Sequence, residues 1–341
     1  MNNLFAEEYH LNFLSGLGDN LERLDKSMDW GVFAPKLEVS LARSGGSRGG
    51  GPPFDALKMF KALIVQKCFN LSDEALEFRL NDSLSFMRFT GFEFGGKMPD
   101  ARTIWKFKEE LSRSGAMGRL FSLFLSLLEK AGLVAHKGCI ADATFAEAPR
   151  SRSTREENAG LKADRIPEGW SGSKLRRKDR DAKWTKKRNG ARYGCKNHVK
   201  ADKGSKLVLS CATTPANVHD SEMIGLLVSE GDRAVWADAG YVGAEKGMPA
   251  GTEKIICEKG LRGRPLTEEQ REPNRRKSKV RCRIEHVFGR FMTAMSGCMR
   301  IRTIGIARAR FGIALSNLPC NMLRAEFLTR GRMPVCGITA P

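Results

Sequence analysis

The stretch VWADAGYVG, residues 235–243, ends an apolar run in Asp238, a small residue, a glycine and Tyr241. Such a run predicts a buried strand, and a carboxylate at the end of a strand can either form a turn or hold a metal ion. The stretch KGCIADATF, residues 137–145, repeats the pattern Ala-Asp-Ala-x-aromatic around Asp142. Each predicted strand therefore carries an aspartate between small residues, which let a backbone or a bulky ligand approach closely.

A third acidic side chain, Glu285, lies in the basic helical stretch KVRCRIEHVFGRFM, four residues after Arg281. Taken alone, it is explained by an i, i+4 ion pair with Arg281 worth about 0.2–0.5 kcal/mol. If its helix packs against the predicted sheet, it can share one pocket with Asp142 and Asp238. Three clustered carboxylates repel one another unless a cation compensates them. We therefore predict that these three residues are catalytic and bind Mg²⁺ or Mn²⁺, two ions per site, across a phosphodiester.

The positive charge of the chain is concentrated in two segments. The net charge is +19, of which residues 151–200 and 261–310 contribute +10 each, so that the other residues sum to about −1. Clustered Lys and Arg residues are what counterion release from phosphates requires, whereas solvated loops that keep the protein soluble are the plainer explanation. Because nearly all of the excess lies in two segments, the charge favours a nucleic acid as partner.

The first part of the chain has a helical pattern. Residues 54–69 carry apolar side chains at helical spacing, and Ser72 and Asp100 are placed to cap the helices that follow them. Short helices in this region could form a helix-turn-helix, in which Arg102 and Lys106 would lie on the face toward a DNA groove. A bundle packed only for stability is the alternative.

From residue 136 the pattern changes to strands that alternate with fewer helices. Residues 146–192 are rich in charge, Gly and Ser, which predicts a mobile basic insertion outside the core. Helices are expected at 221–230 and at 279–292, and Asp220 is expected to be the N-cap of the first, with assistance at the carboxylate site as the alternative. Together these elements predict an α/β fold with a mixed sheet flanked by helices. The predicted strands are 137–145, 193–202, 206–214, 233–242 and 253–259.

The change of pattern also predicts the domain organisation. Residues 1–135 are expected to form an all-α N-terminal DNA-binding domain. Residues 136–330 are expected to form the α/β domain, with its insertion at 146–192, and residues 331–341 to form a tail.

The remaining composition predicts a cytoplasmic protein, associated with the nucleoid through its DNA partner. Nine cysteines are scattered without a C-x-x-C pair, so neither a zinc ribbon nor a disulfide framework is indicated. No apolar stretch reaches the roughly 20 residues that a membrane helix needs, and no secretory signal is visible at the N-terminus.

Several motifs of the chain resemble, in the same order, those of bacterial insertion-sequence transposases of the DDE superfamily. The branch typified by insertion sequence five is the most similar. The motifs are KGCIADATF, YGCKNHVKAD, ATTPANVHDSEMIGLL, WADAGYVG and VRCRIEHVFGRFM. The N-terminal stretches LSDEALEFRLNDSLSFMRFTGF and MPDARTIWKFKEEL also resemble that branch, and the resemblance spans roughly residues 50–325.

This resemblance implies a ribonuclease-H-like catalytic domain in which Asp142, Asp238 and Glu285 form the Asp-Asp-Glu set. It implies metal-dependent cleavage at the terminal inverted repeats of an element, followed by attack of the freed 3′-hydroxyl on target DNA. Arg281 matches the arginine of the family's Tyr-Arg-Glu-Lys signature, whereas Ser278 and Met292 stand where tyrosine and lysine are usual. One active site per DNA end makes a homodimer on DNA the expected working unit.

The expected DNA contacts come from basic residues near the predicted site and in the N-terminal region. Lys196 and His198 share one face of a predicted strand, where a solvated strand edge is an equal alternative. Trp170 and Trp184, which lie among basic residues of the insertion, could stack on unpaired bases or anchor the loop. The residues predicted to bind DNA are Arg281, Lys277, Lys279, Arg290, Lys196, His198, Arg102 and Lys106.

Two other classes of function fit the same residues. A metal-dependent nuclease would share the carboxylates but would not join the cut DNA to a target. An inactive or repurposed derivative of a transposase would bind DNA through the basic segments without needing a metal.

Overall fold

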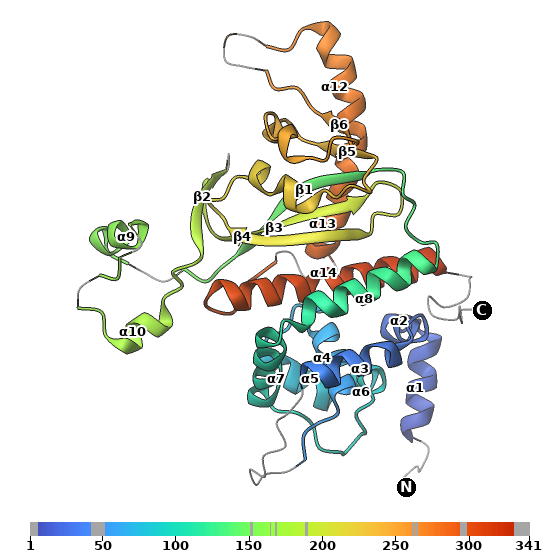
Figure 1. Cartoon of the computed structure of the whole chain (residues 1–341). Coiled ribbons are helices and arrows are strands. Elements are labelled where there is room, and N and C mark those ends of the chain that lie inside the picture. The colour runs from blue at the N-terminus through green and yellow to red at the C-terminus, as the bar shows by residue number, and fades with distance from the viewer. Residues whose placement is uncertain are drawn as a thin grey trace.

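The computed structural model describes residues 6–41, 52–150, 153–163, 165–167, 169–187, 190–260, 263, 265–293 and 299–330. In this part of the chain a helical N-terminal half lies on one side of a mixed sheet, with a long C-terminal helix between them (Figure 1). This arrangement confirms the predicted fold class. The predicted tail at 331–341 lies outside the described residues. None of the described helices is long and apolar enough to cross a membrane.

The N-terminal helices begin at the capping residues that the sequence predicts. The Ser72 hydroxyl accepts a hydrogen bond from the Ala75 amide at 3.1 Å, and the Asp100 carboxylate accepts one from the Thr103 amide at 2.7 Å. These bonds satisfy amide groups that have no partner inside a helix. The helices are α1 (Ala6–Gly16), α2 (Asn20–Lys26), α3 (Ala34–Ser40), α4 (Ala56–Cys68), α5 (Asp73–Asp82), α6 (Leu84–Thr90), α7 (Ala101–Arg113) and α8 (Ala116–Lys130).

The sheet has six strands, and two kinds of pairing meet at its centre. The strands are β1 (Cys139–Glu147), β2 (Lys183–Lys187), β3 (Gly190–Asp202), β4 (Val208–Pro215), β5 (Ala234–Ala237) and β6 (Glu253–Ile256). Strand β3 pairs antiparallel with β1, β2 and β4, whereas β1 pairs parallel with β5, and β5 with β6. The main order is therefore β4-β3-β1-β5-β6, with β2 beside the first part of β3. The mixture of antiparallel and parallel pairing agrees with the mixed sheet that the sequence predicts.

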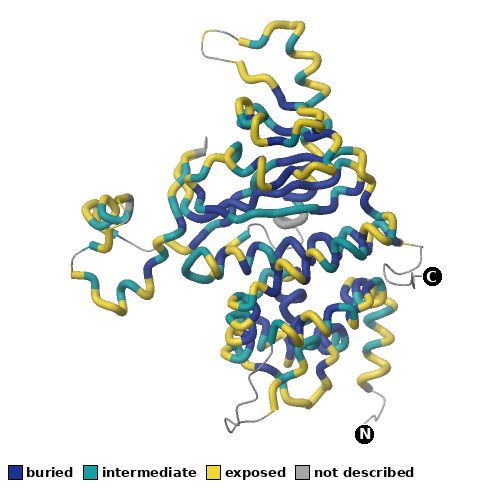
Figure 2. Tube along the Cα trace, in the orientation of Figure 1, coloured by how far each residue is buried: buried dark blue, intermediate teal, exposed yellow. Residues whose placement is uncertain are grey.

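Helix α14 (Ile306–Thr329) packs on both the sheet and the N-terminal helices. Its Asn321 side chain accepts a hydrogen bond from the amide of Val208 on β4 and donates one to its carbonyl, both at 2.8 Å. Asn317 of α14 and Asn197 of β3 also exchange hydrogen bonds, at 2.8 and 3.3 Å. One cluster of buried apolar side chains extends from α2 through α4 and α8 to α14 and β3, and Figure 2 shows the buried trace along these layers. The two halves of the chain therefore share one core.

The basic insertion contributes to the sheet, which corrects part of the prediction for 146–192. It contains α9 (Arg155–Lys162), α10 (Gly172–Arg177) and β2, whose residues pair with β3. Ala182 is buried in an apolar cluster with Ile313 of α14. The expectation that the whole stretch lies outside the core is wrong, because backbone pairing with β3 holds β2 without any aliphatic pattern of its own.

Three other predicted elements are shorter or divided. The helix expected at 221–230 is a 3₁₀ turn, η2 (Asp220–Met223), and one short helix, α11 (Ile224–Leu227). Its N-cap is His219 rather than Asp220, so the predicted capping role of Asp220 is wrong. Strand β5 ends at Ala237, and the helix expected at 279–292 is divided into α12 (Glu268–Arg281), a 3₁₀ turn η5 (Cys282–Ile284) and α13 (Glu285–Thr293).

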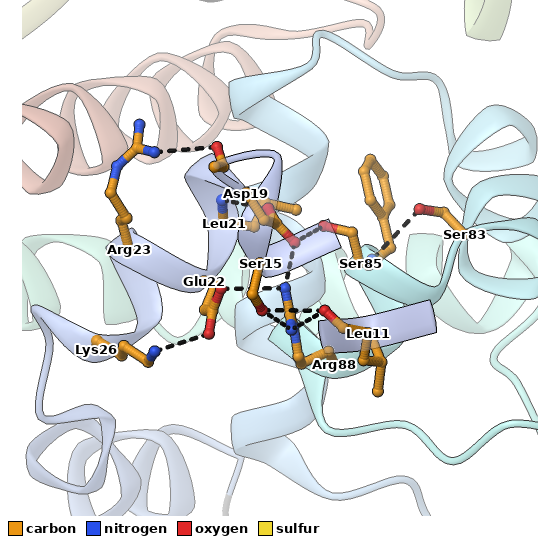
Figure 3. Close-up of polar contacts among 12 residues, drawn as sticks. Leu11, Ser15, Asp19, Leu21, Glu22, Arg23, Lys26, Ser83, Ser85 and Arg88 are labelled. Atoms are coloured by element: carbon orange, nitrogen blue, oxygen red, sulfur yellow. Dashed lines mark hydrogen bonds and ion pairs between the residues drawn. The ribbon is translucent and has the colours of Figure 1, made fainter. Parts of the chain in front are cut away.

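A polar cluster around Arg88 ties the first helices to α6 (Figure 3). The Arg88 guanidinium donates to the Leu11 carbonyl at 3.1 Å, to the Ser15 hydroxyl at 2.8 Å and to the Asp19 carboxylate at 2.7 Å. Burial opposes ionisation of Asp19, but hydrogen bonds from Ser85 and Arg88 hold the pKa of this carboxyl below its usual range. The cluster therefore depends on an ionised Asp19.

We expect Arg88→Met to lower the free energy of unfolding by roughly 3 kcal/mol, because it leaves a largely buried carboxylate without its cation. Since the folded-state pKa of Asp19 is lowered, its stabilising contribution is present above the unfolded pKa of about 3.9 and is lost as pH falls through the folded pKa. The difference between native and variant chains in urea unfolding should therefore shrink below about pH 4. Arg113→Met, which removes an exposed arginine 3.9 Å from Glu109, is the control. Equal losses in the two variants would contradict a structural role for this cluster.

Candidate metal and nucleic-acid site

Parallel pairing between β1 and β5 places the two predicted catalytic aspartates at one level. Cys139 pairs with Val235 and Ile140 with Trp236, and continuing this register for two more residues brings Asp142 opposite Asp238. Both side chains are partly buried at the end of β5. The register places the two aspartates side by side, but only Asp238 follows a strand end, because β1 continues past Asp142 to Glu147.

The local role of Asp238 is to begin a turn. Its Oδ1 atom accepts a hydrogen bond from the Gly240 amide at 2.8 Å, which caps the 3₁₀ turn η3 (Ala239–Tyr241). Glycine at position 240 suits this close contact, because a Cβ there would lie 2.9 Å from Oδ1 of Asp238. The small residues after Asp238 thus serve the turn, and this turn use occupies only one of the two carboxylate oxygens.

Helices α12 and α13 bring Arg281 and Glu285 to the same strand end. Arg281 donates from Nη1 to Oδ2 of Asp142 at 2.9 Å and lies 3.9 Å from Oε1 of Glu285. The side chain of Asp142 is 13% exposed, whereas that of Glu285 is 62% exposed. The i, i+4 pairing of Arg281 with Glu285, expected from the sequence, is therefore present, but the shorter contact of Arg281 is with Asp142.

The electrostatics of Asp142 link all three carboxylates. Burial raises the pKa of Asp142 to about 6. The amide of Ala143 and the guanidinium of Arg281 lower it, while the negative charges of Asp238 and Glu285 raise it. The charges of Asp238 and Glu285 thus act on Asp142, and the guanidinium of Arg281 offsets part of their effect.

This donor set suits a divalent cation, although its side chains are not gathered around one point. Three carboxylates against one guanidinium leave a net charge of −2, and carboxylate oxygens are preferred ligands of Mg²⁺ and Mn²⁺. Among the residues that the structure describes, no three acidic, histidine or cysteine side chains lie close enough together to hold a metal ion. The three carboxylates are not gathered around one point because Arg281 is hydrogen-bonded to Asp142 and the Glu285 side chain extends into solvent.

Lys196 and His198 lie on the opposite face of the sheet, which corrects the prediction for these residues. In the antiparallel register they are opposite Phe145 and Ala143 of β1, and since side chains alternate along a strand, Asp142 points to the other face. Strand β3 is internal, with 8% of Lys196 and none of His198 exposed. The alternative of a solvated strand edge is wrong, and so is direct contact of His198 with DNA.

The two residues instead form a buried network with Asp220. The Lys196 ammonium lies 2.9 Å from the Asp220 carboxylate and donates to the Val218 carbonyl at 2.7 Å. His198 is 2.8 Å from the Thr214 hydroxyl and 3.8 Å from Asp220. Burial lowers the pKa of His198 to about 4, against the effect of Asp220, so the imidazole is neutral at physiological pH.

Tyr241 is a residue of the site to which sequence reasoning gave no role. Its side chain is completely buried, and its hydroxyl has no hydrogen-bond partner within the described part of the chain. Burial raises its pKa, and the charges of Asp142, Asp220 and Asp238 add to this effect. The pattern Ala-Asp-Ala-x-aromatic, which occurs around both Asp142 and Asp238, is the sequence feature that could have pointed to Tyr241.

The other predicted DNA contacts divide into exposed and structural residues. Arg102, Lys106 and Lys279 are exposed. Lys277 donates to the Ile256 carbonyl at 3.0 Å and so holds the end of β6. The side chain of Arg290 lies outside the described residues.

Positions that depart from the family signature can be placed in part. The Ser278 hydroxyl lies 3.7 Å from the sulfur of Cys257, a contact that joins α12 to the strand end after β6. Met292 stands where the signature has a lysine, and its side chain lies outside the described residues.

The two tryptophans of the insertion have different surroundings. Trp170 donates to Glu157 at 2.8 Å and packs under Lys174, which fits the anchoring alternative. Trp184 is 48% exposed and packs against Tyr193 with 5.3 Å between ring centroids. Base stacking therefore stays a prediction for Trp184.

Comparisons with known proteins place the chain in a family. Residues 9–110 match a transposase domain family (DUF772), and residues 135–321 match the transposase DDE domain family. Among solved structures, a piggyBac transposase synaptic complex with hairpin DNA is similar with a TM-score of 0.44 and 11% identity, over 93% of this chain and 77% of that chain. Because the DDE model alone covers more than half of the chain, the protein belongs to the transposase DDE domain family.

Proposed function

We propose that the protein is a DNA transposase that cleaves DNA at the terminal inverted repeats of an insertion sequence and joins the freed end to target DNA. The observation that carries the proposal is the parallel register that sets Asp142 level with Asp238, together with the effect of Asp238 and Glu285 on the pKa of Asp142. The family assignment supports the same chemistry. The motifs quoted above favour the branch typified by insertion sequence five.

In this proposal Asp142, Asp238 and Glu285 hold the divalent cations. When bound, Mg²⁺ or Mn²⁺ supplies Lewis-acid activation of water and of the 3′-hydroxyl and neutralises charge on the phosphodiester. Arg281 balances part of the charge of Asp142 in the absence of a metal ion. Glu285 can join the site by rotation of its side chain, because 62% of it is free of packing.

The basic segments supply the affinity for DNA that three acidic residues alone would oppose. Arg281, Lys279 and Arg290 lie on helices next to the carboxylates, and Arg102 and Lys106 lie on the exposed side of α7. We propose these residues as phosphate contacts. Because each DNA end needs one active site, we further propose that two copies of the chain act together on the two ends.

We expect Asp238→Asn to abolish metal-dependent nicking of a labelled duplex that carries the flanking inverted repeat. Loss of one ligand charge weakens the metal site, whereas the turn formed by Asp238 can keep its hydrogen bond through the amide oxygen. Glu253→Gln, which removes one exposed carboxylate from the neighbouring strand β6, is the matched control and should nick normally. Tight duplex binding without nicking by the native chain would instead favour the inactive derivative.

The joining step separates a transposase from a nuclease. With a supercoiled target and a pre-cleaved repeat end, a transposase gives covalent products in which repeat and target are joined. A nuclease gives cleaved repeat ends alone, and this result would contradict the second half of the proposal.

We also expect Mg²⁺ to raise the melting temperature of the native chain at pH 7.5 and to do so much less in Asp142→Asn. The folded-state pKa of Asp142, about 6, lies above its unfolded value, so the carboxylate is ionised above pH 6 at a cost in folding stability that a bound cation offsets. The Mg²⁺-dependent rise should therefore decline as pH falls through about 6, since protons compete for the carboxylate. Differential scanning calorimetry measures the effect, with Glu253→Gln as control. A pH-independent rise, equal in Asp142→Asn, would count against metal binding at this site.

A further inference from the structure

A cavity of about 380 Å³ lies where the two halves of the chain meet, away from the carboxylate site. Helices α4, α5 and α7 line it on the N-terminal side, and residues 299–304 and α14 line it on the other. Its volume falls in the range of about 300–1,000 Å³ that is typical of small-molecule sites. We name it the inter-half pocket. The basic residues that line it are Lys67, Lys108, Arg176, Arg300, Arg302 and Arg308.

Two of these cations are already paired with acidic residues of the pocket. Lys108 forms an ion pair with Asp73, and Arg308 contacts both oxygens of Glu109, at 2.5 and 3.0 Å. The one other acidic residue of the lining is Glu74, at the exposed start of α5. Four cations against this one remaining carboxylate leave the pocket positive.

Lys67 is one of the four cations of the lining to which the described residues supply no acidic partner. Its side chain extends from α4 toward α14, so that Nζ lies 3.7 Å from the position that a Cβ on Gly312 would occupy. Within the described part of the chain its ammonium group makes no hydrogen bond or ion pair. Burial lowers its pKa to about 8, Lys108 and Arg302 lower it further, and Asp73 opposes them. An ammonium that lies among other cations is stabilised when an anion joins it.

Arg302 is held in position beside it. The guanidinium donates from Nη1 to the side-chain oxygen of Asn70 and from Nη2 to the backbone oxygen of Asn70, both at 2.9 Å. These bonds to a neutral partner fix the plane of the guanidinium and leave its charge uncompensated. A guanidinium held in this way presents its other N–H groups to an oxyanion.

We propose that the inter-half pocket binds a phosphate group, with Lys67 and Arg302 as its principal contacts. The group can belong to a DNA strand or to a small phosphate-bearing molecule, since both present the same oxygens. The DNA source rests on the proposed function, whereas binding of phosphate itself does not. Arg176 of the insertion and residues 300–302 bring parts of both basic segments to the pocket, which favours DNA.

The test compares Lys67→Met with Lys130→Met in the full chain. Lys130 is an exposed lysine at the end of α8, so both variants lose one charge and keep a side chain of similar size. Thermal unfolding is followed in sodium phosphate and in sodium chloride at equal ionic strength. With about 10 mM phosphate, we expect native and Lys130→Met chains to gain about 2–4 °C more than in chloride and Lys67→Met to gain much less.

The chloride measurement controls for folding. Because Lys67 is unpaired, Lys67→Met should be at least as stable as the native chain without phosphate. Arg176→Met, at an exposed position of the lining, provides a second variant that cannot disturb the core and should lose part of the phosphate effect. Full retention of that effect in both Lys67→Met and Arg176→Met would overturn the proposal.

Sulfate adds a pH-dependent form of the test, because it does not change charge near neutral pH. Lys67 faces Lys108 of α7, Arg302 and Asp73 of α5, and its pKa of about 8 lies below those of ordinary lysines. The gain in melting temperature from sulfate should therefore fall as pH rises through about 8 in the native chain and stay flat in Lys67→Met. A sulfate effect with the same pH profile in both chains would contradict the pocket.

Duplex binding at several salt concentrations identifies the source of the phosphate. If a DNA strand supplies it, Lys67→Met should reduce the slope of log affinity against log salt by about 0.9, and Lys130→Met should not. An unchanged slope with loss of the phosphate effect assigns the pocket to a small molecule. Absence of cleavage with an intact phosphate effect would count against the proposed function and leave the pocket standing.

Discussion

Parallel pairing of β1 with β5 is the constraint on which the candidate site depends. These strands are distant in the sequence, and their first register pairs, Cys139 with Val235 and Ile140 with Trp236, determine that Asp142 and Asp238 end side by side. A shift by one residue would turn one aspartate to the other face of the sheet. The turn that Asp238 caps then ends β5, so the backbone leaves the sheet where the carboxylates need space.

Helix α14 connects this site to the rest of the molecule. It is anchored to β3 and β4 through Asn317 and Asn321, and its other side packs on the N-terminal helices. Ion pairs between the halves, such as Arg308 with Glu109, add to this joint. Because the core is shared, helix α7, which carries Arg102 and Lys106, has a defined position relative to the sheet. A transposase needs this if DNA contacts in the N-terminal half are to present a strand to the carboxylates of the sheet.

Two charged clusters of opposite sign are left incompletely balanced. Beside the end of β5, one guanidinium pairs with Asp142 and Glu285 while Asp238 lies next to them, and burial raises the pKa of Asp142 to about 6. Between the halves, Lys67 and Arg302 have no acidic partner among the described residues, and burial lowers the pKa of Lys67 to about 8. In each cluster, neighbouring charges of the same sign make the charged form of the residue unfavourable. Binding of a ligand of opposite charge therefore stabilises the folded chain. One cluster suits divalent cations and the other a phosphate group.

The sequence by itself determined the helical and mixed-sheet halves, the caps at Ser72 and Asp100, and the i, i+4 pairing of Arg281 with Glu285, because these follow from local periodicity, short-range hydrogen bonds and motif spacing. The contact of Arg281 with Asp142 was decided by the tertiary structure. Only the tertiary structure decided that β2 joins the sheet, that Lys196 and His198 are buried on the face away from Asp142, and that Asp220 pairs with Lys196 instead of capping a helix. Lys67 is equally invisible in the sequence, where it is one more lysine of an amphipathic helix. The physical reason is the same in each case: burial and charge pairing arise from residues that are far apart in the chain, and no local pattern records which of them will meet.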